Sequence, residues 1–251
     1  MFHAKVTENR RSRIRVSSTA VAVCLAIGVA SLALAKPHHH GTHVSYPNFH
    51  STKGLKLNAN AVRSGKRLRL TSEPDQIGSA FTKRSVLSPK KSFHASFQID
   101  IHDGTQGDGM TFVIQRGSAG KVGAGGGGLG YSGINHSVAV EFDTYLNFEA
   151  HDPDANHVAV LKNGNTGNHL VVDSPSPGPY GGPRSIWADY SAKRKRLKVF
   201  YTDKAKKPKK ALLSQKINLQ QVLGGKARAG FTAATGGSFE IADVTGFKLK
   251  Q

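Results

Sequence analysis

The segment VAVEFDTYLNFEAHDPDANHV, residues 138–158, determines how the rest of the chain is interpreted. It opens with an alternating apolar run that ends near Asp143, and a second run starts at His157. Period-two runs predict strands, with the polar residues between them forming a loop. Glu141 and Asp143 stand two residues apart on the first strand, so both carboxylates leave the same face.

Five side chains with oxygen or nitrogen donors fall within the 17 residues that end at His157. Three are carboxylates, which would repel one another strongly unless cations neutralised them. Carboxylate and amide oxygens suit a hard ion such as calcium, and an imidazole beside carboxylates suits manganese or zinc. An acidic surface loop with a stray histidine is the alternative, but the strand–loop–strand context and the otherwise basic chain disfavour it. The donors are Glu141, Asp143, Asn147, Asp152 and His157.

Short alternating runs continue on both sides of this segment. Glycine, proline, asparagine and aspartate cluster between them, and only residues 212–223 suit a short helical turn. Many short strands without a β–α–β rhythm predict an all-β, antiparallel sandwich or barrel. No linker or internal repeat divides the chain, which predicts one domain. The other runs are residues 61–71, 93–101, 110–114, 157–161, 197–201, 229–234 and 239–249.

The 251-residue chain is strongly basic, with 35 Lys and Arg against 16 Asp and Glu and a formal net charge of +19. This balance predicts attraction to anionic surfaces and says nothing about fold. A hydrophobic content of 38% with 28 glycines is typical of a globular β-rich protein and excludes a disordered or fibrous one. Cys24 is the single cysteine, so an intramolecular disulfide is excluded.

The first 35 residues have the layout of a secretory signal. Arginines precede a mostly apolar run over residues 16–34, and small residues frame a cleavage site at Ala35. An uncleaved membrane anchor is the alternative, because about 18 apolar or small residues could just span a bilayer. Cleavage would remove five basic residues and one acidic residue, which lowers the excess from +19 to +15. We expect a signal peptide over residues 1–35, a flexible lead-in over 36–46 and a folded domain over 47–251, secreted to the extracellular space or the periplasm.

The segment over residues 138–158 resembles the metal-binding segment of legume-type (L-type) lectins, with the spacing unbroken from Glu141 to His157. The similarity extends, in the family's order, over residues 54–71, 107–112, 126–130 and 230–236. These stretches resemble the family's first strands, its aspartate–glycine stretch, its glycine-rich loop and its late strand. The resemblance implies a concanavalin-like antiparallel jelly-roll sandwich. It also implies a bacterial secreted member of the family that binds carbohydrate without catalysis.

The resemblance implies two metal ions under the loop. In the family these ions shape the loop rather than touch the sugar, and a loop dense in acidic residues has little reason to order by itself. Two of the carboxylates bridge the ions. The transition metal, expected to be Mn²⁺ or another divalent ion, is held by Glu141, Asp143, Asp152 and His157. Ca²⁺ is held by Asp143, Asn147, Asp152 and the backbone carbonyl of Tyr145.

The resemblance also implies the sugar contacts. Asp108 would accept from sugar hydroxyls and would follow a non-proline cis peptide after Gly107. The remaining groups are the Asn147 amide as donor, a backbone amide at Gly127 or Gly128, the Tyr145 ring as a stacking surface, and the short final loop around Gly237. That loop is short and bare, so both galactose-like and mannose-like ligands remain open.

A strongly basic stretch over residues 193–210 lies outside this pattern. It predicts a hairpin whose tip and flanks carry ten positive charges, and the plain interpretation is a solvated edge that discourages sheet-to-sheet aggregation. The functional alternative is an adhesion or matrix protein that binds anionic polysaccharide or another anionic surface, with a steep salt dependence. No aromatic interleaving points to specific nucleic-acid binding. Pairing of two copies is open, although like charges would oppose it. The charges are Lys193, Arg194, Lys195, Arg196, Lys198, Lys204, Lys206, Lys207, Lys209 and Lys210.

A glycoside hydrolase is the rival enzymatic interpretation, because hydrolases also use jelly-roll sandwiches. Retaining hydrolysis needs a second carboxylate about 5 Å from the nucleophile. The positions that would supply it on this strand face are Tyr145 and Leu146, and neither carries a carboxylate. The sequence therefore favours a binding protein over an enzyme.

Overall fold

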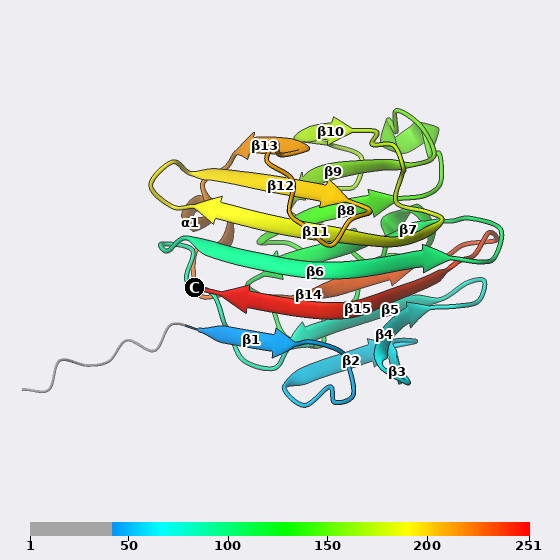
Figure 1. Cartoon of the computed structure of the whole chain (residues 1–251), viewed down its shortest axis with the longest axis horizontal. Helices are drawn as coiled ribbons and strands as arrows, with labels where there is room; N and C mark the ends of the chain where they lie inside the picture. The colour runs from blue at the N-terminus through cyan, green and yellow to red at the C-terminus, as the bar shows by residue number, and fades with distance from the viewer. Residues whose placement is uncertain (1–41) are drawn as a thin grey trace, which may run out of the picture. The chain divides into compact units, whose positions relative to one another are not determined.

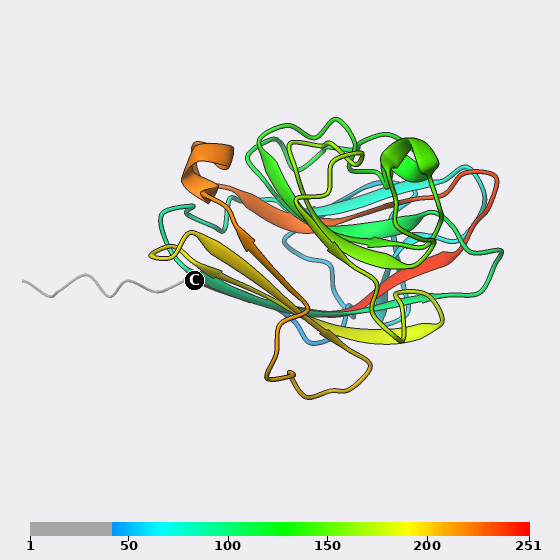
Figure 2. The same cartoon turned by 90° about the horizontal axis from the view of Figure 1, so that it is seen from above.

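The computed structural model describes residues 42–251 as two antiparallel β-sheets packed face to face (Figures 1 and 2). This confirms the all-β sandwich. The expected signal peptide lies outside the described residues, as does most of the lead-in. Within the described part of the chain, no helix is long and apolar enough to cross a membrane.

One sheet has eight strands and the other has seven, and every strand pair is antiparallel. The eight-stranded sheet runs β13 (Leu213–Lys216), β12 (Arg196–Thr202), β11 (Gly182–Ser191), β6 (Phe93–His102), β15 (Ile241–Lys250), β4 (Arg67–Thr71) and β3 (Val62–Ser64), with β1 (His43–Tyr46) also paired to β15. The seven-stranded sheet runs β10 (Val171–Asp173), β9 (His157–Lys162), β8 (Ser137–Asp143), β7 (Gly109–Gln115), β14 (Arg228–Ala234), β5 (Ile77–Thr82) and β2 (Leu55–Ala59).

Five phenylalanines join the two sheets at the centre of the core. Phe97 of β6 packs 4.8 Å, centroid to centroid, from Phe112 of β7 and 5.2 Å from Phe231 of β14. Phe247 of β15 and Phe142 of β8 complete the group, most of it in edge-on or tilted contacts. Aromatic pairs favour such geometry, and each ring buries a large apolar area. The period-two runs place these rings because alternate residues of each strand face inward.

The seven-stranded sheet is covered on its outer face as well. Inward residues of β8 such as Val140 join the main core, while Ala139 packs under Tyr131 and Ile134 of the glycine-rich segment in a second apolar cluster. Every residue of β8 is therefore buried. Because Glu141 shares the outer face with Ala139, the cover that buries Ala139 leads directly to the candidate metal ligands.

Two elements differ from the sequence expectations. Residues 43–46 of the expected flexible lead-in form β1, which pairs with β15, and Tyr46 stacks on Phe49 with centroids 5.4 Å apart. β5 was not predicted, because its Gly-Ser-Ala sequence lacks an apolar alternation. It needs small residues, since a side chain at Gly78 would meet the Leu70 carbonyl at 2.1 Å. The helical turn expected within residues 212–223 is α1 (Leu219–Leu223).

Candidate functional site

The pairing of β8 with β9 gathers the predicted ligands on the outer face of the seven-stranded sheet. Asp143 lies directly opposite His157, and Glu141 lies opposite Ala159. Residues two apart on a strand share a face, so these three polar side chains converge. Glu141, Asp143 and His157 are 1%, 2% and 0% exposed. The predicted strand–loop–strand arrangement is thus present, and these three side chains lie below the surface.

The loop after β8 is held by its own carboxylates. The Tyr145 backbone N–H donates to Asp143 Oδ1 at 2.8 Å, and the Asn147 N–H donates to Asp152 Oδ2 at 2.7 Å. A single 3-10 turn, Phe148–Ala150, lies between these bonds. Asp152 Oδ1 lies 3.8 Å from His157 Nε2. One Asp152 oxygen therefore folds the loop while the other faces the imidazole.

His157 is oriented by a backbone carbonyl. Its Nδ1 lies 3.1 Å from the carbonyl oxygen of Asp154, a contact that places the ring proton on Nδ1. Nε2 then presents a lone pair toward the carboxylates, 3.7 Å from Glu141 Oε2. This arrangement, with one ring nitrogen fixed and the other free, is typical of metal-ligating histidines.

His169 also reaches this cluster, and the sequence analysis did not identify it. It comes from the connection between β9 and β10, and its Nε2 lies 3.3 Å from Glu141 Oε2. Its ring lies beside that of His157, with centroids 5.1 Å apart. A histidine twelve residues beyond the last predicted ligand, in a polar loop, carries no spacing signal, and only the fold brings it here.

Burial and like charges perturb the ionisation of the cluster. Burial, followed by repulsion from Glu141, raises the pKa of Asp143 well above its usual value. Burial also raises the pKa of Asp152, against the stabilising Asn147 amide. Burial would lower the pKa of His157, but the attraction of Glu141 outweighs it and the pKa rises. Without a cation, Asp143 and Asp152 therefore hold protons more tightly than free carboxylates do. A bound cation would favour their charged forms.

Asp108 lies beside the same loop. The peptide bond between Gly107 and Asp108 is cis, as the resemblance predicted. The Asp108 carbonyl accepts from the Thr144 N–H at 3.0 Å, and the Asp108 N–H donates to the Ala234 carbonyl at 3.3 Å. These bonds connect the start of β7 to the loop after β8 and to the end of β14. Burial raises the pKa of Asp108 to about 6, opposed by the Gly236 amide.

The glycine-rich segment presents one free amide next to Asn147. The Gly128 N–H already donates to the Gly125 carbonyl at 2.9 Å, whereas Gly127 makes no such bond among residues 42–251. A Cβ at Gly127 would lie 2.5 Å from Asn147 Oδ1, so the Asn147 amide packs against bare backbone. Of the two predicted backbone donors, the Gly127 N–H is available for a ligand, whereas the Gly128 N–H already donates a hydrogen bond.

Aromatic side chains and an open loop form the exposed side of the site. Tyr145 is 42% exposed, and Gly237 is exposed with open space at its Cβ position. Phe148, one residue after Asn147, is 80% exposed and was not among the predicted contacts. Phe148 therefore adds a second exposed aromatic ring to the loop that carries Tyr145.

Glu240 contacts the residue before Asp108, and the sequence analysis did not identify it. Its Oε2 accepts from the Gly107 N–H at 3.1 Å and from the Thr144 hydroxyl at 2.7 Å. Glu240 is fully buried. It therefore links the residue before Asp108 to the loop that carries the candidate metal ligands.

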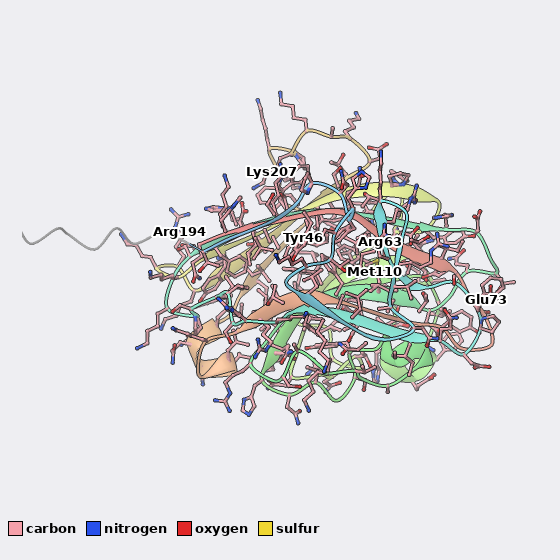
Figure 3. All side chains as sticks on the ribbon, turned by 90° about the horizontal axis from the view of Figure 1, so that it is seen from below. Tyr46, Arg63, Glu73, Met110, Arg194 and Lys207 are labelled. Carbon is pink, nitrogen blue, oxygen red and sulfur yellow. The ribbon has the colours of Figure 1, made fainter. Side chains whose placement is uncertain are left out.

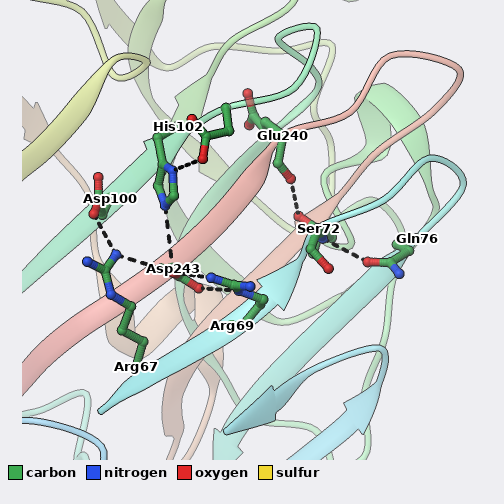
Figure 4. Close-up of polar contacts among 10 residues, drawn as sticks. Arg67, Arg69, Ser72, Gln76, Asp100, His102, Glu240 and Asp243 are labelled. Atoms are coloured by element: carbon green, nitrogen blue, oxygen red, sulfur yellow. Dashed lines mark hydrogen bonds and ion pairs between the residues drawn. The ribbon is translucent and has the colours of Figure 1, made fainter. Parts of the chain in front are cut away.

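An ion-pair network fixes the strand that follows Glu240 (Figure 4). Buried Asp243 of β15 accepts from Arg69 Nε and Nη2, each at 3.0 Å, and from Arg67 Nη1 at 3.3 Å. Arg67 Nη1 also pairs with Asp100 of β6 at 2.6 Å. Two-pronged contacts of this kind add geometric specificity. The network holds the start of β15 and hence the end of the loop that contains Gly237.

Replacing Glu240 with Gln should make the stability of the metal-free protein less dependent on pH. Burial raises the pKa of Glu240 from 4.5 to about 7, so the folded chain keeps a proton that the unfolded chain loses. This contribution is present below pH 4.5 and is lost as pH rises toward 7. Gln cannot ionise and still accepts both hydrogen bonds, so Glu240→Gln should be more stable than wild type at pH 8, by at most about 3 kcal/mol.

Urea unfolding at pH 5 and pH 8 with a chelator present measures this difference. Asp173→Asn, at an exposed carboxylate of β10, is the matched control. If the difference in unfolding free energy between wild type and Glu240→Gln is the same at both pH values, Glu240 does not have a raised pKa.

Buried polar atoms without partners concentrate at this site. Among residues 42–251, eight buried side-chain nitrogen or oxygen atoms have no hydrogen-bond partner, and six of them lie here. Buried polar groups are nearly always satisfied, so such a concentration indicates a place for an ion or a polar ligand. The six are Asp108 Oδ2, Glu141 Oε2, Asn147 Oδ1, His157 Nε2, His169 Nε2 and Glu240 Oε1.

The basic stretch lies on both sides of β12, as the sequence predicted, and its charges gather at the two ends of that strand. Lys193 to Lys195 occupy the turn between β11 and β12, and Lys204 to Lys210 occupy the loop at the other end of β12 (Figures 2 and 3). The seven residues of β12 separate the two groups by roughly 20 Å. Lys207 bends back to pair with Asp189 and lies 4.0 Å from the centre of the Phe200 ring.

Comparison with known proteins agrees with this geometry. The sequence model of the legume lectin domain family matches residues 42–251. The L-type lectin-domain containing receptor kinase S.7 of Oryza sativa subsp. japonica is 31% identical over 224 residues, which cover 83% of this chain and 29% of that protein. The galactose-binding lectin of Arachis hypogaea is 33% identical over 189 residues, covering 70% of this chain and 64% of that lectin. The chain thus spans less than a third of the receptor kinase's length.

Solved structures show the same fold. A lectin from Bauhinia forficata in complex with GalNAc has a TM-score of 0.74 at 23% identity, covering 84% of this chain and 97% of that one. Peanut lectin with a 9mer peptide has a TM-score of 0.71 at 22% identity, with coverages of 84% and 97%. These relatives are plant proteins, and the bacterial origin expected from the resemblance finds no support among them. The family match covers the whole described sandwich, so this chain belongs to the legume lectin domain family.

Proposed function

We propose that this chain is a secreted, non-catalytic carbohydrate-binding protein whose sugar site depends on bound calcium and a transition metal. The observation that carries the proposal is the group of six unpartnered buried polar atoms on residues around the loop after β8. The names of the relatives support the ligand class, since one is called a galactose-binding lectin and one solved lectin is in complex with GalNAc.

The donors present fit the two ions. Asp143, Asp152 and His157 offer ligand atoms that all lie within 4.8 Å of one another, and Glu141 adjoins them. The oxygens of Asp143, Asn147, Asp152 and the Tyr145 carbonyl would hold calcium, whereas the imidazole and the Glu141 carboxylate suit the transition ion. The bound ions would neutralise the buried carboxylates and hold the loop in one conformation.

Side chains and backbone amides of the chain would then contact the sugar directly. Asp108 Oδ2 is buried without a partner, so it can accept from a sugar hydroxyl at little further desolvation cost. The Asn147 amide and the free Gly127 N–H supply donors on the opposite side, and Tyr145 can stack on the apolar face of a pyranose. Glu240 and Thr144 position Asp108 without touching the ligand.

The non-catalytic part of the proposal rests on where the acidic groups lie. Glu141 and Asp143, the carboxylates that a hydrolase interpretation would use, are buried beneath the loop. Glycosidic cleavage needs two carboxyl groups flanking an accessible bond. Asp108 is the carboxylate whose buried, unpartnered oxygen would face the sugar, whereas Glu149 is exposed beside Gly127 and Asn147.

Chelation should separate this function from the basic-surface alternative. Binding of the full chain to immobilised galactose, N-acetylgalactosamine, mannose and an acidic polysaccharide is measured with EDTA, with calcium and manganese restored, and in 50 mM against about 500 mM NaCl. We expect binding to a neutral sugar that disappears with EDTA and returns with metal. Binding that survives EDTA and is lost only at high salt would replace the lectin function by an anionic partner at the two basic segments.

A further inference from the structure

His169 lies at the transition-metal position although the family resemblance did not include it among the ligands. Its side chain is 7% exposed, so it is enclosed within the site rather than lying over it. Its Nε2 lies 3.3 Å from Glu141 Oε2 and 3.6 Å from Asp152 Oδ1. His157 Nε2 lies 3.7 and 3.8 Å from the same two oxygens. Both imidazole nitrogens therefore face the same two carboxylate oxygens.

The four atoms face one another across a gap. A hydrogen bond from an imidazole to a carboxylate spans about 2.7–3.2 Å, and all four separations exceed this range. Glu141 Oε2, His157 Nε2 and His169 Nε2 are each buried without a hydrogen-bond partner in the described part of the chain. The four pairs lie within ion-pair distance but are too long for direct hydrogen bonds, a spacing that suits an ion between the nitrogens and the oxygens.

The spacing also distinguishes between coordination geometries. Nitrogen and oxygen ligands about 2.0–2.1 Å from zinc in a tetrahedron lie about 3.4 Å apart. Adjacent ligands of an octahedral ion at similar range lie closer, about 3.0 Å apart. Glu141 Oε2 lies 3.3 Å from His169 Nε2 and 3.7 Å from His157 Nε2, nearer the tetrahedral value. The three-residue group of Glu141, His157 and His169 meets the separation limit for a shared ion by itself.

We propose that His169 is a direct ligand of the transition-metal position, beside Glu141 and His157, and that this second imidazole makes the position favour zinc over manganese. A second imidazole replaces an oxygen donor, and imidazole nitrogen suits zinc whereas oxygen-rich octahedral sites suit manganese. This inference rests on the metal-dependent function proposed above. It adds the identity of one ligand and the choice of ion.

The test compares zinc and manganese affinities of the full chain after removal of metal. Zn²⁺ and Mn²⁺ are titrated separately, in competition with a chromophoric chelator, into wild type, His169→Ser and His169→Gln. We expect both variants to lose at least about 10-fold in zinc affinity and less than about 3-fold in manganese affinity, so that the preference for zinc narrows. His50→Ser removes an exposed histidine outside the cluster and should behave as wild type.

Cobalt(II) gives a readout that does not depend on sugar binding. Wild type loaded with Co²⁺ should show the intense visible absorption of a four- or five-coordinate ion, and His169→Ser should show the weak absorption of a six-coordinate one. Added imidazole should restore the intense spectrum to His169→Gly, because it can fill the vacated ligand position.

The outcomes separate this inference from the proposed function. Unchanged zinc affinity and unchanged cobalt spectra in folded His169 variants would overturn the ligand assignment while leaving metal-dependent sugar binding in place. Folding is checked by circular dichroism and thermal unfolding. Wild type that binds neither calcium, manganese nor zinc would overturn the proposed function as well.

Discussion

Asp143→Asn should abolish metal-dependent sugar binding while leaving the metal-free protein at least as stable as wild type. The carboxylate of Asp143 lies with Asp152 and His157 in one group of donors, and the resemblance makes it a bridge between the two ions. Replacing it with a neutral amide would remove one negative charge from both positions at once. We expect sugar affinity to fall at least about 100-fold, because the loss of a charged hydrogen-bonding group at a buried site costs about 3 kcal/mol.

The metal-free stability distinguishes this effect from misfolding. Burial and Glu141 raise the pKa of Asp143 well above its usual value, so its ionised form destabilises the empty site at neutral pH. That stability is present at low pH and is lost as pH rises through the elevated pKa. Asn cannot ionise, and its amide oxygen can still accept from the Tyr145 N–H. The unfolding free energy of metal-free Asp143→Asn at pH 8 should therefore equal or exceed that of wild type.

Thermal unfolding with and without calcium and manganese measures both effects together. A ligand at 100 times its dissociation constant stabilises the native state by about 2.7 kcal/mol. For a domain of this size that corresponds to roughly 5–10 °C, which Asp143→Asn should lose. Asp173→Asn, at an exposed carboxylate, should keep the full shift. A metal-induced shift of wild-type size in Asp143→Asn would remove Asp143 from the ligand set.

Asp108→Asn should weaken sugar binding by about 10- to 100-fold without changing metal affinity. Asp108 Oδ2 is buried and unpartnered, and its backbone bonds to Thr144 and Ala234 do not involve the carboxylate. Asparagine keeps the size of the side chain but replaces a charged acceptor by an amide, and hydrogen bonds to charged groups contribute about 1.5–3 kcal/mol. The sugar site should therefore be impaired while the loop and its ions remain.

Calorimetry with the sugar identified by the immobilised-sugar experiment, followed by the thermal shift on adding metal, tests this separation. The metal-induced shift should match wild type within error. A variant that binds sugar as wild type does would show that Asp108 is not a contact. A variant that loses the metal shift would show instead that Asp108 acts through the loop and not on the sugar.

The two variants together divide the site into a part that holds the loop and a part that contacts ligand. Asp143 is predicted to affect both parts, because the loop after β8 carries Tyr145 and Asn147 as well as the ligands. Asp108 is predicted to affect the second alone, since it reaches the loop through its backbone carbonyl. Glu240 holds the residue before Asp108 through the Gly107 amide and does not touch the ligand. Its substitution is therefore measured by the pH dependence of stability, which its raised pKa controls.

The local sequence was sufficient to predict the fold class and the donors between Glu141 and His157. Alternating residues of a strand must face opposite sides, so the pattern placed Glu141 and Asp143 on one face before any tertiary contact was known. The chain between Asp143 and His157 is short and both ends lie on paired strands, which brings Asp143, Asp152 and His157 within reach of one shared ion. The cis peptide before Asp108 followed from the resemblance and is present.

Only the tertiary structure showed which residues from distant parts of the chain join the site. His169 meets Glu141 because β9 and the segment before β10 double back beside β8, and Glu240 meets Gly107 across 133 positions of sequence. The choice of Gly127 over Gly128 depends on which amide a local turn already uses. The basic residues, adjacent in sequence, were separated because a strand places its two ends far apart. Sequence spacing determines which side chains share a strand face, whereas strand pairing and loop closure determine which faces meet.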